Sequence, residues 1–589
     1  SVDVLRGPQG ALYGRNAIGG AILISTRQPT ETPEFNLRVS AAEGKDYTLA
    51  GSASGPLAGR DVLGRFSFRV QDREGQLKNA YLDNQYVDFK DSVSMRGKLL
   101  FTPSDKLTID LRAQYLDQDA GSGYFTPGTD FFLPLPPPND PIIVDVPEFE
   151  IQSNKIGESF VRSSEVSAKI DYELGWATLT SITSFTDVDS GNDQDLDQTF
   201  VEAIDILVID DSETFAQELR LVSDDDRALR WVAGLSWFSQ DRFRSLATTF
   251  LGTPVPPAAQ DLRLEDFAVF GNLSYDLSDA LELTLAFRWD EETPEDLTQG
   301  RSETFRELQP KASLAYRFNE DLLGYVTIGK GFRAGGFNNV APGSNFQPGF
   351  DSESLISYET GLKTSTAGGR LRAGLSLFFI DYTDQQYFLF DQTGTQANIN
   401  IPKSEIFGGE LELTAQPADS LLLNLGIGFT DSEIVEYEDI AGVLVPASDI
   451  VGRKVPGAPV LSIMFSGQHT ATLNDSLDLV TRFDIEIGVV IYARVRYVVV
   501  DPDGEMVFRS IFGHLVKDAL DHGRSELLRA QTVASADHAG DLGLLGPRPF
   551  ACERGHDVEV ERLAVGTGLL GAIQCSDDLG GGGQGLEQV

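Results

Sequence analysis

The residues best suited to a specific chemical role are two arginines, Arg6 and Arg15, in a glycine-rich segment from Val4 to Gly20 (VLRGPQGALYGRNAIGG). They are its only charged side chains, and its glycines allow the backbone to turn sharply and to approach other backbone closely. A guanidinium buried in such a packed segment needs carboxylate partners, because its desolvation is otherwise uncompensated. A phosphate-binding loop is excluded, since no Gly-Lys-Ser/Thr follows the glycines. The alternative is a generic turn-rich loop.

Carboxylates that could pair with these arginines lie in segments of alternating polarity. In Ser357–Thr364 (SYETGLKT), a period of two puts Glu359 on the face opposite the neighbouring apolar side chains. In Phe407–Pro417 (FGGELELTAQP), Glu410 and Glu412 share one face while the intervening leucines share the other. If these segments are strands of a barrel wall, the glutamates face its interior. The alternative is that they only line a hydrated interior.

No residue pattern indicates catalysis or a resident metal. The five His are too scattered for a catalytic triad. The acidic stretch Asp187–Asp197 lacks the glycine and the bidentate glutamate of a calcium-binding loop, so we expect a solvated loop there. Cys552 and His556 have a C-x₃-H spacing without a second matched pair, which makes a zinc site a poor interpretation. We therefore expect no enzymatic activity, no metal site and no cofactor.

Composition excludes two broad classes of protein. The chain has 89 acidic and 47 basic residues, a net charge of -42, so it should repel nucleic acid. It has no run of about 18 apolar residues, which excludes a transmembrane helix but not a membrane barrel, whose strands alternate in polarity. Its two Cys suit an oxidising envelope compartment, where unpaired thiols are a liability.

The elements that must position the candidate residues are β-strands. Between Phe35 and Ile485 the dominant pattern has a period of two, and the clearest case is Leu281–Asp290 (LELTLAFRWD). Such runs last roughly ten residues, the length that a tilted strand needs to cross a bilayer. Short turns such as Thr102–Lys106 alternate with long links such as Gly121–Gly157, as in outer-membrane barrels.

Aromatic residues gather toward the ends of the expected strands, where interfacial girdles would lie: Trp231, Trp237, Trp289, Tyr316, Tyr325, Phe378 and Tyr382. We count about 19 candidate strands before Ile485, against about 22 in a plugged outer-membrane transporter. A soluble all-β sandwich would show the same alternation but rarely needs so many strands. The fold class predicted is therefore all-β, an incomplete transmembrane antiparallel barrel of the 22-strand type.

The segment Val4–Gly20 closely resembles the C-terminal end of the plug domain of TonB-dependent outer-membrane receptors. Further matches to that family follow in its order along most of the chain: Phe215–Ser223 with Trp231–Phe238 (FAQELRLVS, WVAGLSWF), Lys330–Asn338 (KGFRAGGFN), Ser357–Thr364, Phe407–Pro417 and Val455–Ile463 (VPGAPVLSI). The resemblance implies gated uptake of a scarce nutrient through a plugged barrel, most often an iron chelate.

The resemblance also implies partners, a location and a role for the charged residues. The partners are the TonB energy-transducing complex, whose docking segment we expect to lie outside this chain, an iron chelate or similar small substrate, and the lipid and lipopolysaccharide of a Gram-negative outer membrane. Family members clamp plug arginines to barrel glutamates. We therefore expect Arg6, and with weaker support Arg15, to pair with Glu359 and Glu410.

Three regions are predicted: residues 1–28 as the end of a plug, 29–485 as the barrel, and 486–589 as an atypical tail. The tail holds four of the five His and both Cys, and Met506–Arg529 reads as a helix rather than as a strand. A break in the reading frame or in gene assembly near residue 485 would explain this change and would leave about three strands missing from 22.

Two rival functions stay open. A passive porin would need no plug, so Val4–Gly20 argues against it. An extracellular all-β carbohydrate-binding protein or adhesin would differ from a barrel in the environment of its apolar face. The loops do not identify a cargo, because siderophore–iron, cobalamin, haem and oligosaccharides use the same architecture.

Overall fold

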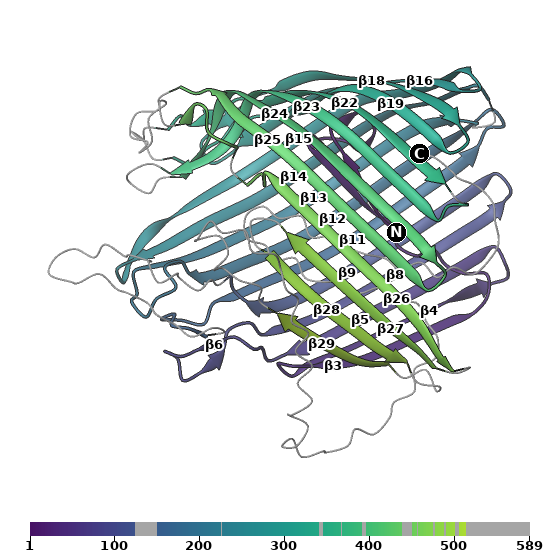
Figure 1. Cartoon of the computed structure of the whole chain (residues 1–589). Helices are drawn as coiled ribbons and strands as arrows, with labels where there is room; N and C mark the ends of the chain where they lie inside the picture. Colours follow the sequence, from purple (N-terminus) through teal and green to yellow (C-terminus); the bar gives the residue numbers. More distant parts are fainter. Residues whose placement is uncertain are drawn as a thin grey trace.

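The computed structural model describes residues 1–123, 150–224, 227–340, 346–366, 368–390, 396–438, 450–455, 457–474, 477–487, 491–500 and 506–513. These residues form one large antiparallel β-sheet that closes on itself as a barrel (Figure 1). Within them, no helix is long and apolar enough to span a membrane. The all-β antiparallel barrel predicted from the alternation is confirmed.

The described barrel contains twenty-two strands, of which β17 has only two residues. In spatial order they are β11 (Glu158–Glu173), β12 (Ala177–Asp195), β13 (Ile204–Ser223), β14 (Leu229–Phe250), β15 (Thr253–Ser278), β16 (Leu281–Asp296), β17 (Arg301–Ser302), β18 (Phe305–Asn319), β19 (Leu322–Arg333), β22 (Glu353–Thr366), β23 (Leu371–Phe390), β24 (Gln396–Ala418), β25 (Leu421–Glu436), β26 (Leu461–Asn474), β27 (Leu477–Ile487), β28 (Ile491–Val500), β29 (Met506–Gly513), β3 (Glu34–Ala42), β4 (Asp46–Ala58), β5 (Val62–Arg73), β8 (Lys90–Ser104) and β9 (Leu107–Gly121).

Two strands follow the point at which the sequence predicted the barrel to stop. β28 pairs with β27 in antiparallel register, β29 pairs with β28, and β29 lies beside β3 in the closed sheet. The barrel is therefore closed in the described chain, where the sequence predicted an incomplete one. The helix predicted for Met506–Arg529 is wrong for Met506–Gly513, because pairing with β28 provides a strand partner there. Residues 514–589, with four His and both Cys, lie outside the described residues.

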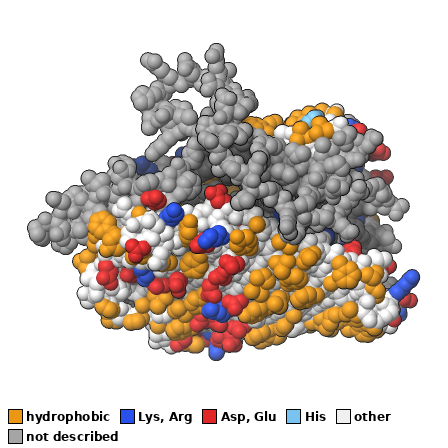
Figure 2. Space-filling view, turned by 90° about the horizontal axis from the view of Figure 1, so that it is seen from below, with side chains coloured by type: hydrophobic (Ala, Val, Ile, Leu, Met, Phe, Trp, Pro, Cys, Tyr) orange, Lys and Arg blue, Asp and Glu red, His pale blue; other side chains and the backbone are white. Residues whose placement is uncertain are grey.

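The two faces of the wall differ as the period of two predicts. On β16, Leu285 and Phe287 are exposed on the outside, whereas Arg288 and Asp290 are buried. Figure 2 shows broad areas of hydrophobic side chains on the face that it presents. Among the aromatic residues predicted for a girdle, Trp237 and Tyr316 are exposed on the outer face.

Three of the predicted girdle residues instead take inward positions. Tyr325 alternates with the exposed Val326 and donates its hydroxyl to a glutamate of β22. Phe378 lies between the exposed Leu377 and Phe379, and Tyr382 has the same parity as Phe378. Position near a strand end therefore did not decide which face these rings occupy; the parity of the residue did.

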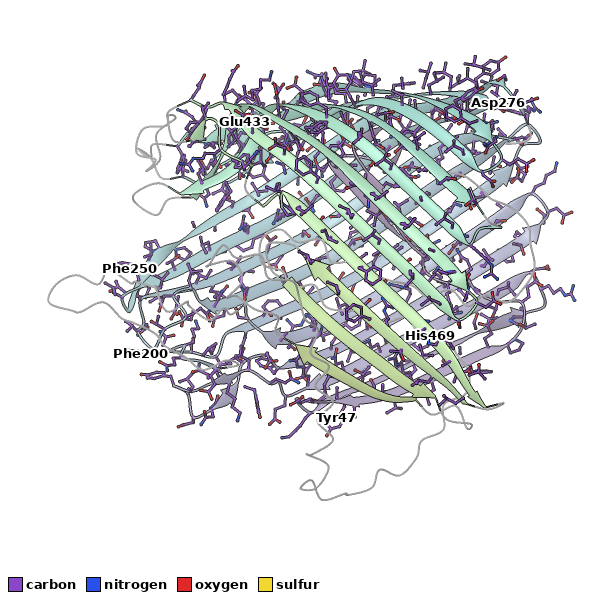
Figure 3. All side chains as sticks on the ribbon, viewed as in Figure 1. Tyr47, Phe200, Phe250, Asp276, Glu433 and His469 are labelled. Carbon is purple, nitrogen blue, oxygen red and sulfur yellow. The ribbon has the colours of Figure 1, made fainter. Side chains whose placement is uncertain are left out.

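The turns at the two ends of the barrel differ in length. The turn between β15 and β16, beside Asp276, is short, and so are the turns from β8 to β9 and from β18 to β19. The opposite end carries the longer links, among them residues 74–89 and 334–352, although Phe250 stands at a short turn there. Figure 3 shows Asp276 at one end of the barrel and Phe200 and Phe250 at the other.

Small sheets occupy the long links. β6 (Lys78–Asn79), β7 (Gln85–Tyr86) and β10 (Glu150–Ile151) form a three-stranded sheet, and β20 (Gly336–Phe337) pairs with β21 (Gly349–Phe350). Buried polar groups join these links. Asn79 donates to the Ser153 carbonyl (2.8 Å), and the Ser153 hydroxyl donates to Asp195 (2.7 Å).

The acidic stretch Asp187–Asp197, predicted as a solvated loop, lies at the end of the barrel where these links are joined, which we call the rim. β12 continues to Asp195, and Asp195 and Asp197 are buried. The Asp195 carboxylate accepts the backbone N–H groups of Asp197 and Gln198, at 3.0 and 2.9 Å. The loop prediction is therefore wrong, because these carboxylates satisfy backbone donors at the end of a long strand instead of facing water.

Candidate functional site

The first 28 residues form an N-terminal segment that lies inside the barrel. It consists of β1 (Val2–Arg6), the single helical turn α1 (Gly10–Tyr13) and β2 (Gly20–Ile24), with β1 and β2 paired as an antiparallel hairpin. Gly20 has a φ of 153°, and a Cβ there would lie 2.4 Å from the Leu5 carbonyl oxygen. Only glycine fits this close approach without moving the backbone.

Contacts from the N-terminal segment reach well-separated arcs of the wall. At its C-terminal end, Lys98 of β8 donates to the Thr26 carbonyl (3.1 Å), and Gln28 donates to Asp110 of β9 (3.4 Å). Its other contacts reach β14, β15, β16, β18, β19, β22 and β24. A segment held from so many strands is surrounded by the wall.

Arg6 stands between carboxylates of β24. Its Nη1 lies 2.5 Å from Glu410 Oε2, and its Nη2 lies 2.5 Å from Glu412 Oε1. Glu359 of β22 attracts the guanidinium from farther away and accepts the Tyr325 hydroxyl (2.5 Å). Burial by itself lowers the pKa of Arg6, but the Glu410 and Glu412 carboxylates outweigh it and raise that pKa above its usual range.

The structure thus brings Arg6 and Glu410 together and keeps Glu359 in the same cluster. It adds Glu412, which shares the inward parity of Glu410, and Lys311 of β18. Lys311 Nζ donates to the Pro8 carbonyl at 3.4 Å and to Gln9 Oε1 at 3.2 Å. Parity could have marked Lys311 as inward-facing, but its contact with residues 8 and 9 depends on how the chain turns after Arg6.

Arg15 does not join this cluster. It binds Glu292 of β16, with Nη2 2.6 Å from Oε1 and Nε 3.2 Å from Oε2, and its guanidinium stacks 4.9 Å from the Phe238 ring centre. The predicted pairing of Arg15 with Glu359 or Glu410 is therefore wrong. The reason is α1, which packs against β15, β16 and β18 and carries the chain away from β22 and β24.

Behind Glu292 the wall holds a buried polar network. Arg288 Nε lies 2.6 Å from Asp290 Oδ1, and Gln309 of β18 donates to Asp290 Oδ2 at 2.7 Å. Asp266 of β15 lies 3.4 Å from Arg288 Nη2, and its Oδ1 has no hydrogen-bond partner among the described residues. The alternation in Leu281–Asp290 already puts Arg288 and Asp290 on the inner face, and Glu292 continues it.

The described parts of the chain contain no group of three or more His, Cys, Asp or Glu side chains arranged to hold a metal ion. Among the described residues, Arg6, Arg15 and Arg288 instead pair with carboxylates inside the barrel. What the arrangement provides is a set of ion pairs between a short N-terminal segment and the wall around it.

Comparisons with known proteins agree with this architecture. A family model described as TonB dependent receptor-like, beta-barrel, matches residues 94–506. The pesticin receptor of Yersinia enterocolitica is 23% identical over 436 residues, which cover 70% of this chain and 60% of that receptor. The ferrioxamine B receptor of Salmonella typhimurium (strain SL1344) is 27% identical over 124 residues, 21% of this chain and 16% of the receptor. The chain thus spans 60% of the length of the pesticin receptor.

Solved structures with the same fold include two iron-chelate receptors. The ferric yersiniabactin uptake receptor FyuA from Yersinia pestis superposes with a TM-score of 0.69 at 17% identity, covering 85% of this chain and 79% of that one. The ferripyoverdine receptor of the outer membrane of Pseudomonas aeruginosa gives a TM-score of 0.64 at 16% identity, covering 86% of this chain and 68% of that one. At these identities the likeness establishes the fold.

Proposed function

The chain belongs to the family of TonB-dependent receptor-like β-barrels, and from this premise we propose that it imports a scarce nutrient across the outer membrane of a Gram-negative bacterium. The substrate class that we propose is a siderophore–iron complex. Support comes from relatives with receptor names of this kind, among them a ferrioxamine B receptor and a ferric enterobactin receptor of Pseudomonas aeruginosa. The protein acts as a transporter and not as an enzyme.

The observation that carries this proposal is the set of ion pairs formed by Arg6. In our interpretation, residues 1–28 are the C-terminal end of a plug, residues 29–485 are the barrel domain, and the Arg6 contacts with Glu410 and Glu412 are plug–barrel contacts. An ion pair between half-exposed groups is stable enough to hold a segment and weak enough to be exchanged for water. Such a contact suits a plug that is docked at rest and displaced during transport.

In this proposal, substrate binds at the end of the barrel that carries the long links, and the TonB complex supplies the energy that displaces the plug. The outer face of the barrel contacts lipid, with lipopolysaccharide around the end that carries the long links. A passive porin would transport its substrate without TonB. An extracellular carbohydrate-binding protein or adhesin would not be embedded in the outer membrane.

The test is uptake of radiolabelled iron, supplied on a panel of siderophores, by cells that lack other iron-chelate receptors. These cells carry the chain in the outer membrane together with the TonB-docking segment that we expect to lie outside it. Parallel strains have or lack the TonB gene. Uptake of at least one chelate that requires TonB supports the proposal. Uptake of the same size without TonB indicates a porin, and absence of the chain from the membrane fraction supports the extracellular alternative.

A further inference from the structure

The N-terminal segment is tied to the wall by two arginine contacts that differ in their access to water. The Arg6 side chain is 52% exposed, and its partners Glu410 and Glu412 are 29% and 61% exposed. The Arg15 side chain is 22% exposed, and Glu292 is 6% exposed. Within this chain, water can therefore reach the Arg6 contacts more readily than the Arg15 contact.

The charges around Glu292 make loss of Arg15 costly. Asp266, Asp290 and Glu292 contribute three carboxylates, and Arg288 is the cation that the wall itself supplies beside them. With Arg15 in place, two guanidinium groups face three carboxylates. Without it, one guanidinium faces three carboxylates, and the buried Glu292 loses its ion-pair partner, which is strongly destabilising.

The backbone around Arg15 also fits the wall closely. A Cβ on Gly10 would lie 2.2 Å from Gln309 Oε1, so α1 rests directly on the side chain that donates to Asp290. On the other side, a Cβ on Gly331 would lie 2.9 Å from Ile18 Cγ1. Residues 9–18 are therefore seated on the wall by both shape and charge.

We propose that Arg15 and Glu292, with the nearby carboxylates of Asp266 and Asp290, are positioning residues that keep residues 9–18 docked on the wall while the Arg6 contacts open during transport. This inference rests on the proposed function, because it divides the proposed plug end into a part that releases and a part that stays. It also gives the buried network a role, because the carboxylates of Asp266 and Asp290 add to the negative charge that attracts Arg15.

A first experiment tests the two contacts without transport, by hydrogen–deuterium exchange of the purified full chain in detergent. Amides of Val2–Arg6 report on the Arg6 end. The Gln9 amide, which donates to the Ala17 carbonyl, and the Leu12 and Tyr13 amides, which donate to the Gln9 carbonyl, report on the Arg15 end, which we call the turn. Arg6→Ala should speed exchange at Val2–Arg6 and change exchange at the turn by less than about threefold. Arg15→Ala should speed exchange at the turn by about 100-fold or more.

The matched control for the wall uses neighbouring glutamates of β16. Glu292→Gln should loosen the turn as Arg15→Ala does, whereas Glu291→Gln should leave it unchanged, because Glu291 pairs with Arg306. Equal loosening of both ends by Arg6→Ala, or no effect of Arg15→Ala at the turn, overturns the proposal. These outcomes do not depend on whether the chain transports anything.

A second experiment adds transport, in a variant whose own cysteines, Cys552 and Cys575, are replaced by serine. The pair Ile18→Cys with Gly331→Cys can form a disulfide at the Arg15 end, and Gly7→Cys with Ser357→Cys can do so at the Arg6 end, where a Cβ on Gly7 would lie 4.0 Å from Ser357 Oγ. In the variant with Gly7→Cys and Ser357→Cys, oxidation should stop TonB-dependent uptake and reduction should restore it. In the variant with Ile18→Cys and Gly331→Cys, oxidation should leave uptake unchanged.

Loss of uptake on oxidation of the first pair, or continued uptake with the second pair oxidised, overturns the proposal. Gly7 has a φ of 68°, a backbone conformation that is strained for cysteine. The single variant Gly7→Cys must therefore transport normally before loss of uptake is attributed to the disulfide. If the chain with its own residues shows no TonB-dependent uptake, the proposed function fails, and the exchange experiment still decides whether Arg15 is the firmer anchor.

Discussion

Two glutamates that bind the same guanidinium allow a sharp test of how exposure sets the strength of an ion pair. Glu410 and Glu412 lie on one strand and each approaches Arg6 to 2.5 Å, but Glu410 is 29% exposed and Glu412 is 61% exposed. A charge-assisted hydrogen bond contributes about 1.5–3 kcal/mol where water is excluded, and the half-exposed Arg6 leaves the Glu410 contact at the lower end of that range. An exposed pair of the same length contributes about 0.2–1 kcal/mol.

Glu410→Gln should therefore weaken the docking of residues 2–6 by about 1.5 kcal/mol, and Glu412→Gln by about 1 kcal/mol or less. At about 1.4 kcal/mol per factor of ten, exchange of the Val2–Arg6 amides should rise about tenfold in the first variant and no more than about fivefold in the second. Hydrogen–deuterium exchange with mass-spectrometric detection of the N-terminal peptide measures both.

Arg6→Ala supplies the control, because neither substitution should add much to it once the guanidinium is gone. An equal effect of the two substitutions, or a larger effect of Glu412→Gln, would refute the argument from exposure. So would full additivity of Glu410→Gln with Arg6→Ala, since residues that act through one contact must couple.

Three further predictions concern the fold. Leu285→Arg on the outer face should destabilise the barrel in lipid by about 2–4 kcal/mol, whereas Leu297→Arg in the turn after β16 should be nearly neutral. Both effects are measured by urea titration of the barrel in vesicles, read out as heat-modifiable gel mobility. Equal tolerance of the two substitutions would contradict a lipid environment for Leu285. Gly20→Ala should open the hairpin of β1 and β2 and raise amide exchange at Val2–Arg6, while Gly19→Ala, where a Cβ meets nothing within 4 Å, should not. Ser153→Ala should remove a hydrogen-bond donor from the buried Asp195 carboxylate and lower the free energy of local unfolding by about 1–3 kcal/mol. Limited proteolysis should then cleave residues 150–157 faster. Unchanged proteolysis would show that this part of the barrel end does not depend on the bond.

Alternation along the chain was sufficient to predict the wall. In Leu281–Asp290 it separated the leucines that face outward from Arg288 and Asp290 that face inward, and in Phe407–Pro417 it put Glu410 and Glu412 on the inner face. This works because successive side chains of a strand point to opposite faces whatever the rest of the fold does. Tyr325, Phe378 and Tyr382 lie near strand ends but face inward, because parity and not position along the strand sets the face of a side chain.

Partners across the interior were harder to predict. Arg6 reached the strand predicted for it, but Arg15 reached Glu292, which no motif had marked, because the single turn α1 redirects the chain between the two arginines. The rim shows the same limit. Asp195 and Asp197 read as loop residues in the sequence, and they are buried because the links before β11 and after β12 meet there.

Residue types and their spacing were enough to predict that this chain forms a barrel wall, which face of the wall is polar, and that two arginines near residue 10 need carboxylates. Those properties follow from residue types and a period of two, which are local. The three-dimensional path of the chain sets which carboxylate each arginine reaches and closes the sheet by placing β29 beside β3. It also leaves the Arg6 contacts more exposed to water than the Arg15 contact. These depend on the path of the chain through three dimensions, because contacts between residues hundreds of positions apart are set by register, strand tilt and the direction of a few turns.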